Sequence, residues 1–165
     1  MAAKVTDLRS ALKMLEDMPG QLIETDVEVE PMAELSGVYR HVGAGGTVMR
    51  PTKEGPAMIF NNVKGHPGAR VAIGVLASRT RVGALLECDP KDLGKKLYHS
   101  VDNPIPPVLT EEAAPCQEVV HKATDPDFDL YKLVPAPTNT PVDAMRSTLR
   151  LECATHRIRI PEQVM

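Results

Sequence analysis

Aromatic residues are scarce in this 165-residue chain: they make up 3% of the sequence, and tryptophan is absent. Core packing must therefore depend on Leu, Val, Ile, Met and Ala. Hydrophobic residues still reach 42% and charged residues 25%, so we expect a chain with a buried core. The length accommodates one domain, or one domain and part of another.

The sequence also lacks a strong excess of charge of one sign and any long apolar run. A net charge of −3 gives no electrostatic footprint for nucleic acid or for an anionic membrane surface. No apolar run approaches the roughly 20 residues of a membrane span. Charges recur throughout residues 1–20, which predicts that there is no signal peptide. We expect neither a nucleic acid nor a membrane partner.

Cysteine is rare, and the three that occur are far apart: Cys88, Cys116 and Cys153. An odd number at these spacings fits neither a disulfide framework nor a CxxC metal or redox motif. A reduced, cytoplasmic compartment is the natural expectation.

Short motifs that carry chemistry are missing as well. The five histidines form no HxH pair and no i,i+4 pair, and each is better explained as a structural or surface residue: His41, His66, His99, His121 and His156. GxGxxG, GxxxxGK[ST] and GxSxG are all absent. Gly43–Gly46 follows an expected helix rather than a strand, so it indicates a helix end and not a phosphate-binding loop.

Residues 6–29 predict a helix followed by a strand. The helix would span residues 6–18, with Thr6 as N-cap and an apolar stripe through Leu8, Ala11, Leu12 and Leu15. Residues 21–29 then alternate, with Ile23, Thr25, Val27 and Val29 expected on a buried face. The acidic residues of the other face are expected to be solvated rather than a catalytic carboxylate pair: Glu24, Asp26 and Glu28.

The middle of the chain predicts further alternation of helices and strands. Pro31 suits the first turn of a helix whose stripe is Leu35, Val38, Tyr39 and Val42. Strands are expected at residues 56–63 and 70–78, the second buried on both faces, with a turn at 64–68 between them. Helices are expected from residue 79 and, with Asp89 as N-cap, through residue 101. The series predicts an α/β or α+β fold with a mixed sheet.

The composition of the chain becomes proline-rich after residue 103. Eight of the fifteen prolines fall between Pro104 and Pro141, so we place a boundary between 103 and 104. One strand is expected at 117–123 and a short helical turn at 125–133. The stiff stretch 128–144, FDLYKLVPAPTNTPVDA, could be an ordinary surface loop or the approach to an active site.

Three segments together resemble one family. They are residues 24–71, ETDVEVEPMAELSGVYRHVGAGGTVMRPTKEGPAMIFNNVKGHPGARV, residues 77–83, ASRTRVG, and residues 122–144, KATDPDFDLYKLVPAPTNTPVDA. They resemble the N-terminal part of UbiD-type decarboxylases, in the branch of the large catalytic subunits of gallate and related hydroxyarylate decarboxylases. The similarity runs from about Asp7 to Ala144 and is specific through its length, because no single short motif is diagnostic.

The resemblance implies a fold and an activity. It implies an N-terminal mixed-sheet α/β domain over 1–103, and over 104–144 a Pro-rich connection that begins a truncated, flavin-binding split β-barrel domain. Members decarboxylate aromatic or α,β-unsaturated acids reversibly and without oxidation, using prenylated FMN, Mn²⁺ and K⁺. The modified flavin acts as the electron sink that an aryl carbanion needs. Implied partners are a hydroxyaromatic acid, companion decarboxylase subunits, a flavin prenyltransferase and further copies in a homo-oligomer, in the context of phenolic acid detoxification.

The same resemblance assigns no catalytic and no metal-binding residue to this chain. In the family the flavin, metal and catalytic residues follow the loop that TNTPVDA resembles, so Asn139 and Asp143 are the nearest candidates for supporting a cofactor site. Residues 145–165 depart from the family pattern, and both a divergent tail and reading-frame slips remain open. We therefore expect an N-terminal fragment without activity or bound cofactor; the alternative is a non-catalytic assembly module left by truncation.

Overall fold

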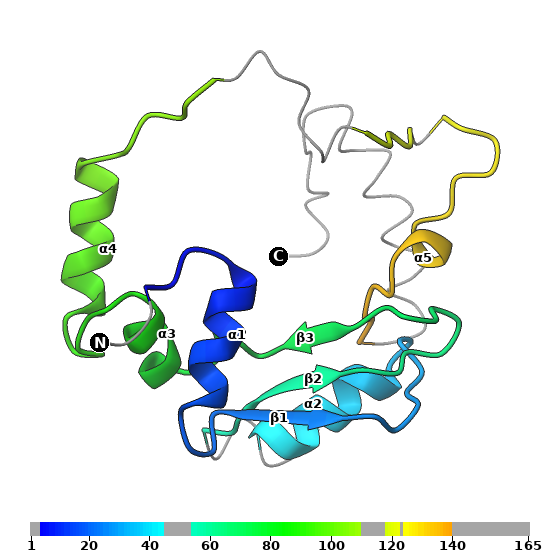
Figure 1. The fold of residues 1–165 in the computed structure, drawn as a ribbon, viewed down its shortest axis with the longest axis horizontal. Coiled ribbons are helices and arrows are strands. Elements are labelled where there is room, and N and C mark those ends of the chain that lie inside the picture. Colours follow the sequence, from blue (N-terminus) through cyan, green and yellow to red (C-terminus); the bar gives the residue numbers. More distant parts are fainter. Residues whose placement is uncertain (1–3, 45–53, 110–117, 123, 140–165) are drawn as a thin grey trace, which may run out of the picture.

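The computed structural model describes residues 4–44, 54–109, 118–122 and 124–139. Its elements follow in the order α1 (Leu8–Glu16), β1 (Leu22–Thr25), α2 (Glu34–Ala44), β2 (Ala57–Phe60), β3 (Val71–Ile73), α3 (Arg79–Leu85), α4 (Leu93–Asp102) and α5 (Leu130–Leu133). The predicted mixture of helices with a mixed sheet is confirmed (Figure 1).

The sheet has three strands in the order β1-β2-β3, with β2 in the centre. β1 runs parallel to β2, with Leu22 opposite Ala57 and Thr25 opposite Phe60. β3 runs antiparallel to β2, with Phe60 opposite Val71. The parallel pair needs a crossover, which contains α2, whereas the antiparallel pair needs only the turn at 64–68. That turn was predicted, and Gly65 and Gly68 have the positive φ values of 79° and 80° that suit it.

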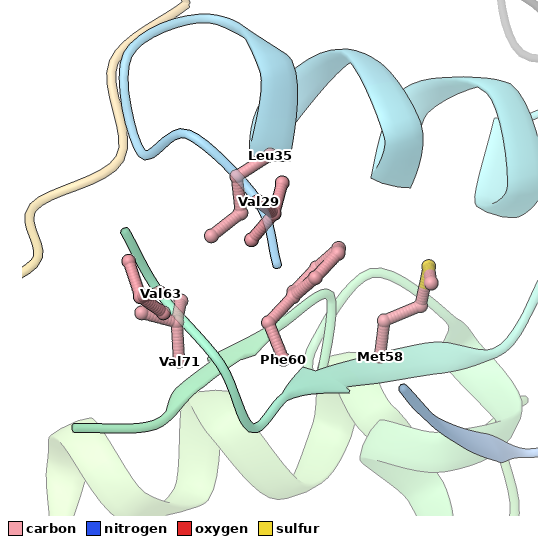
Figure 2. Packing of buried hydrophobic residues seen from close by; sticks show 6 residues of the cluster. All are labelled: Val29, Leu35, Met58, Phe60, Val63 and Val71. Atoms are coloured by element: carbon pink, nitrogen blue, oxygen red, sulfur yellow. The ribbon is translucent and has the colours of Figure 1, made fainter. Parts of the chain in front are cut away.

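The main core lies between α2 and one face of the sheet (Figure 2). Its buried members come from the central strand, from the loops beside it and from α2: Val29, Leu35, Met58, Phe60, Val63 and Val71. Three half-buried residues complete it: Tyr39, Val42 and Ile73. All four residues of β2 are buried, because other parts of the chain cover both of its faces and both of its edges. The aliphatic packing expected from the shortage of aromatics is thus the packing observed.

The first helix forms where expected but begins differently. Its N-cap is Asp7 rather than Thr6. The Asp7 carboxylate accepts a hydrogen bond from the Ser10 backbone N–H at 2.7 Å, and the Asp7 backbone N–H donates to the Ser10 hydroxyl oxygen at 3.0 Å. This reciprocal pair is a capping box, which Thr6 cannot form from its position. Accepting these bonds lowers the pKa of Asp7, chiefly through the Ser10 backbone N–H, because they stabilise the carboxylate.

Only part of the expected apolar stripe of α1 is buried. Ala11 and Leu15 are buried, Leu12 is half-buried and Leu8 is exposed. α1 contacts β1 and α3, and these contacts cover fewer of its residues than the apolar stripe in the sequence predicted.

This gradient of burial gives a testable series of charged substitutions on one helix. Leu15→Asp should lower the free energy of unfolding by several kcal/mol, because it buries a carboxylate without a partner. Leu12→Asp should cost less, and Leu8→Asp should stay within about 0.5 kcal/mol because its side chain is exposed and an acidic residue suits the first turn. Urea unfolding followed by circular dichroism checks the order; equal effects at the three positions would contradict the packing of α1.

Two of the predicted strands are shorter and less buried than expected. β1 covers only 22–25, and Ile23 and Val27 are exposed although the alternation placed them on a buried face. β1 is an edge strand, so helices cover it only in part. Beyond the end of β1, Val29 is again buried in the core and forms an isolated parallel bridge with Val63. The acidic residues of this stretch are exposed, as predicted.

β3 is the second correction, because the run 70–78 forms a strand only over Val71–Ile73. Gly74 has φ of 76° and ends the strand, and its carbonyl accepts from the Ala77 N–H in the turn that leads to α3. β3 is an edge strand with two half-buried residues, not a strand buried on both faces.

The second half of the described chain departs from the compact unit. α4 begins after Asp92, not after Asp89, and Leu93 is its one buried residue. Residues 104–109 and 118–122 have no regular structure, so the described part of the predicted strand at 117–123 is wrong. The helical turn predicted at 125–133 appears as α5, capped by Asp129. The domain boundary between 103 and 104 stays a prediction, and residues 145–165 lie outside the described residues.

Candidate functional site

The most buried charged group of the described chain is Arg81, on α3. Ser78 caps this helix by accepting from the Arg81 backbone N–H, which fixes the first turn. The Arg81 side chain then extends toward the edge of the sheet and is only 1% exposed. A short helix with a side-chain cap at its start thus holds a guanidinium inside the fold.

Arg81 donates only to uncharged oxygens. Its Nη1 reaches Gln21 Oε1 at 3.0 Å and the Gly55 carbonyl at 2.8 Å, and its Nη2 reaches the Gly74 carbonyl at 3.0 Å. Its Nε donates to the Val75 carbonyl at 3.3 Å. These acceptors come from the segments before β1, before β2 and after β3, so one side chain joins the ends of three strands. The planar guanidinium of Arg can donate these four hydrogen bonds in different directions at once, whereas the single ammonium group of Lys cannot.

Burial lowers the pKa of Arg81, and no carboxylate bonds to it directly. Arginine nevertheless stays protonated in proteins, so the group is a buried cation solvated by carbonyl dipoles. Gly74 is tightly placed beside it: its φ is 76°, and an added Cβ would collide with the Tyr39 ring. The geometry describes a structural crosslink rather than a ligand-binding Arg, because its donors already point at protein oxygens.

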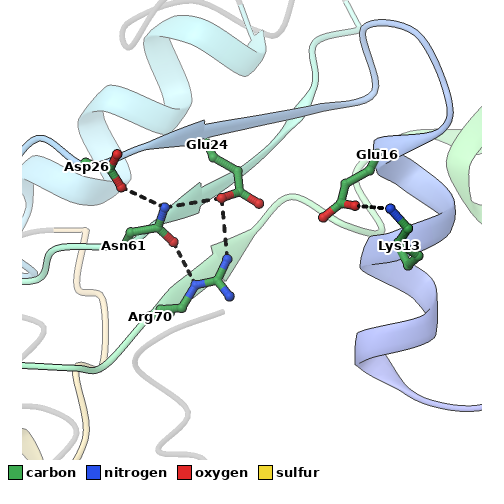
Figure 3. Close-up of polar contacts among 6 residues, drawn as sticks. All are labelled: Lys13, Glu16, Glu24, Asp26, Asn61 and Arg70. Atoms are coloured by element: carbon green, nitrogen blue, oxygen red, sulfur yellow. Dashed lines mark hydrogen bonds and ion pairs between the residues drawn. The ribbon is translucent and has the colours of Figure 1, made fainter.

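A second polar cluster lies on the surface at the end of the sheet (Figure 3). Asn61 is its centre: its amide N donates to Asp26 at 2.9 Å and to Glu24 at 3.2 Å, and its amide O accepts from Arg70 Nε at 2.7 Å. Arg70 also pairs with Glu24 at 3.5 Å. The side chains of this ion pair are about half exposed, so the cluster joins β1 to the connection between β2 and β3 without forming an enclosed site.

The Pro-rich segment returns to the compact unit at Thr138. The Thr138 N–H donates to the Pro31 carbonyl at 3.1 Å, and the Thr138 carbonyl accepts from the Ala33 N–H at 3.0 Å. These bonds make a parallel bridge between Met32 and Thr138, and Ala33 has a φ of 68° there. Thr138 is 6% exposed, and its hydroxyl has no hydrogen-bond partner among the described residues. We call this attachment the 138 latch.

The backbone bonds of the latch lead to a testable prediction. Thr138→Pro removes the N–H that donates to the Pro31 carbonyl. The segment should then detach, so amide exchange at Ala33, whose N–H donates to the Thr138 carbonyl, should become at least tenfold faster. Thr138→Val keeps both backbone bonds and the side-chain shape, and removes only a hydroxyl without a partner. It should leave exchange unchanged or slower. Equal exchange in the two variants would show that the backbone pair does not hold the segment.

The latch also places one of the two residues that the resemblance put nearest to a cofactor site. Asn139 follows Thr138 directly and is exposed. Asp143 lies outside the described residues. Sequence reasoning missed Arg81 and Thr138 as organising residues, although both lie within segments that carry the resemblance. A lone Arg in the otherwise apolar stretch of 81–86 was the available signal for the first.

The described residues do not fit a flavin or metal holder. Among them no three His, Cys, Asp or Glu side chains come together in a way that could hold a metal ion. Arg81, which could have met a phosphate, is already committed to carbonyl oxygens. Across the same residues, no helix has the length and apolar character needed to cross a bilayer.

Comparison with known proteins decides the family. Residues 14–101 match the family model of the 3-octaprenyl-4-hydroxybenzoate carboxy-lyase N-terminal domain, UbiD_N. The chain belongs to the UbiD family. Over 145 residues it is 58% identical to the gallate decarboxylase of Lactiplantibacillus plantarum, which covers 87% of this chain and 30% of that protein.

Solved UbiD-class structures agree with this assignment. The apo structure of 3,4-dihydroxybenzoic acid decarboxylase from Enterobacter cloacae superposes with a TM-score of 0.72 at 57% identity, over 85% of this chain and 29% of that one. HmfF from Pelotomaculum thermopropionicum, in an evolved dimeric form in complex with prFMN, gives 0.61 at 26% identity over 79% of this chain and 27% of its own. The chain thus spans about 30% of the relatives it matches and corresponds to their N-terminal part.

Proposed function

We propose that this chain is the N-terminal part of a prenylated-FMN-dependent, non-oxidative decarboxylase of hydroxyaromatic acids. The observation that carries the proposal is the 58% identity to a gallate decarboxylase, sustained over 145 residues. The E. cloacae structure, at 57% identity, is that of a 3,4-dihydroxybenzoic acid decarboxylase. We propose substrates of the gallate, protocatechuate, 4-hydroxybenzoate or vanillate type; the two similarities support the first two, and the resemblance implies the others.

The role of this part in the reaction is structural. Arg81 ties together the strand ends of the α/β unit, and the 138 latch fixes where the Pro-rich segment returns to it. The chain's own residues therefore set the position from which residues 139 onward continue. Bound prenylated FMN supplies an electron sink for decarboxylation. Because the described residues do not fit that cofactor, we derive no reaction step through it.

Further elements of the proposal follow from the resemblance. They are Mn²⁺ and K⁺ as companion ions, a flavin prenyltransferase and companion decarboxylase subunits as partners, and a homo-oligomer as the assembled state. Cytoplasmic phenolic acid detoxification is the proposed context. Asn139 and Asp143 are proposed to support the cofactor site. The HmfF structure, an evolved dimeric form of a UbiD-class enzyme in complex with prFMN, supports the proposed cofactor and is compatible with an oligomer.

A chimera tests the proposal. Residues 1–144 of this chain would replace the matching region of the L. plantarum gallate decarboxylase, and CO2 release from gallate would be followed with prenylated FMN, Mn²⁺ and K⁺ supplied. We expect turnover within tenfold of the parent enzyme. A folded chimera that binds flavin but releases no CO2 would overturn the proposal. The control is the parent decarboxylase carried through the same cloning and loading steps.

A second function is favoured by the apolar side chains that the second half of the chain exposes. By itself the chain would then be a non-catalytic assembly module that packs against other subunits. Titrating the purified 165-residue chain with prenylated FMN and Mn²⁺ separates the two. A bound-flavin spectrum argues for a catalytic fragment, and its absence together with binding to companion subunits argues for the module.

A further inference from the structure

The helix α4 is attached to the α/β unit at its first turn alone, as far as the described residues go. Leu93 is buried there, the Lys96 ammonium donates to the Leu86 carbonyl, and Arg79 Nη2 donates to the Pro90 carbonyl at 2.9 Å. The remaining residues of the helix are exposed. Figure 1 shows α4 standing at one side of the molecule, away from the sheet.

The exposed part of α4 carries an apolar stripe. Leu97 and Val101, four residues apart, are 53% and 76% exposed, and Tyr98 lies three residues before Val101 on the same side. The stripe continues beyond the helix end in residues that are more than 90% exposed: Ile105, Val108 and Leu109. We call these six residues the α4 apolar surface. The opposite side of the helix bears polar residues, including Lys95 and His99.

This arrangement is unusual for a surface that faces water. A ten-residue helix is marginal by itself and normally gains its stability by packing an apolar face. Contiguous exposed apolar residues of this kind mark interaction sites rather than solvated surface. The polar residues on the other side of α4 show which face is adapted to water. The α4 apolar surface is therefore built to be covered.

The path of the chain indicates what covers it. The chain leaves the compact unit at Leu93 and is attached to it again at Thr138. The described residues between α4 and α5 are exposed, apart from the half-buried Phe128 and Asp129 directly before α5. Both anchors lie within the region aligned with decarboxylases of which this chain spans only about 30%. Most of the polypeptide of those enzymes thus lies outside the aligned region and is available to occupy the space beside the excursion.

We infer that the α4 apolar surface docks the polypeptide that, in the decarboxylases this chain resembles, lies outside the matched region. This inference rests on the proposed function, because it takes the occupant from the same enzyme class. The docked face must be apolar opposite Leu97 and Val101. The helix would then clamp the N-terminal unit onto the remainder of the enzyme, while the 138 latch fixes the course of the connecting chain.

Hydrogen exchange measured on two proteins tests the inference. Peptides covering α4 would be compared between the 165-residue chain and the full-length chimera described above. We expect exchange in the second half of α4 to be at least tenfold slower in the chimera, while peptides of α1 exchange equally in both. Equal exchange of α4 in the two proteins would overturn the inference, because it would leave the surface exposed in the longer protein.

A matched pair of double variants assigns the protection to one face of the helix. Leu97→Ser with Val101→Ser alters the apolar surface, and Lys95→Ser with His99→Ser places the same residue type on the opposite side. We expect the first pair to abolish the protection of α4 in the chimera and the second to retain it. In the 165-residue chain the melting temperatures of both should stay close to that of the parent, since all four side chains are exposed.

Two further outcomes separate this inference from its alternatives. Light scattering of the 165-residue chain would reveal a dimer; a dimer that the Leu97→Ser, Val101→Ser pair dissociates would overturn the inference in favour of a second copy as the occupant. An inactive chimera that still protects α4 would contradict the proposed function and leave the docking intact. An active chimera in which α4 is unprotected would support the proposed function and overturn the docking inference.

Discussion

Arg81→Met is expected to destabilise the α/β unit by about 3 kcal/mol or more, the largest effect of any single side chain outside the apolar core. The change removes the donor of four hydrogen bonds and leaves their acceptors in place. Each bond contributes roughly 1 kcal/mol, and each half-buried acceptor left without a partner adds part of a desolvation cost. Three of the four acceptors are backbone carbonyls, which no side-chain rearrangement can remove from their place beside Arg81.

An opposing effect is weaker. Replacing a buried ionic group by an apolar one can be neutral or stabilising, because the desolvation of the charge is relieved. That result applies when both partners are replaced, whereas here the carbonyl oxygens remain. The loss of the donors therefore dominates. With total stabilities of about 5–15 kcal/mol, the variant loses a large share of its stability.

The measurement is urea unfolding of the 165-residue chain, with Arg79→Met as the matched control. Arg79 lies on the same helix, is exposed and donates to a single carbonyl, so its replacement should change stability by less than about 1 kcal/mol. Arg81→Lys should fall close to Arg81→Met, because one ammonium cannot reach acceptors that surround a planar fork. A midpoint for Arg81→Met equal to that of Arg79→Met would contradict the role of Arg81 as a crosslink.

The 165-residue chain is expected to release no CO2 from gallate, protocatechuate, 4-hydroxybenzoate or vanillate, even with prenylated FMN, Mn²⁺ and K⁺ supplied. The reaction needs a bound electron sink, a metal that holds the cofactor, a cation for the substrate carboxylate and an acid that returns the proton. In the described part of the chain no metal-binding group of side chains occurs, and Arg81 is enclosed among carbonyls. Correct positioning is worth roughly 7–11 kcal/mol of barrier, so an incomplete site loses essentially all turnover.

The parent L. plantarum decarboxylase, loaded in the same mixture, serves as the positive control. Activity would be followed as CO2 release against a blank without protein. Cofactor-dependent turnover by the 165-residue chain would contradict the prediction and direct attention to Asn139, Asp143 and residues 145–165. Asn139→Ala and Asp143→Ala variants would then identify which of the two residues contributes.

Local order was predictable where a residue's neighbours in sequence decide its conformation. The helices at α1, α3 and α5 and the central strand β2 appear within the expected ranges, whereas α2 begins at Glu34 and leaves Pro31 in the preceding turn instead of in its first turn. The errors at helix starts have a local cause: Asp7 caps α1 because Ser10 can reciprocate, and the chain enters α4 at Asp92 after an Asp89 turn. Several nearby residues are acceptable caps, and the choice among them depends on the following turn.

Burial was predictable only in part, because sequence period does not reveal what lies opposite a face. Ile23 and Val27 have the alternation of a buried strand but lie at a sheet edge, where cover is incomplete. Leu97 and Val101 have the spacing of a core-facing helix, yet both side chains are exposed. The two attachments that organise the molecule, at Arg81 and at Thr138, join residues up to 60 and more than 100 positions apart.

The sequence by itself determined the α/β class, the aliphatic core, most of the helices and, through its long resemblance, the family. These follow from composition, period and local capping, which act over a few residues, and from a similarity that extends along the chain. Only the tertiary structure decided that Arg81 is a buried crosslink, that Thr138 closes the Pro-rich excursion and that one face of α4 is uncovered. The reason is physical: hydrogen bonds and burial depend on which distant segments meet, and the chemistry of a single residue does not specify its partners.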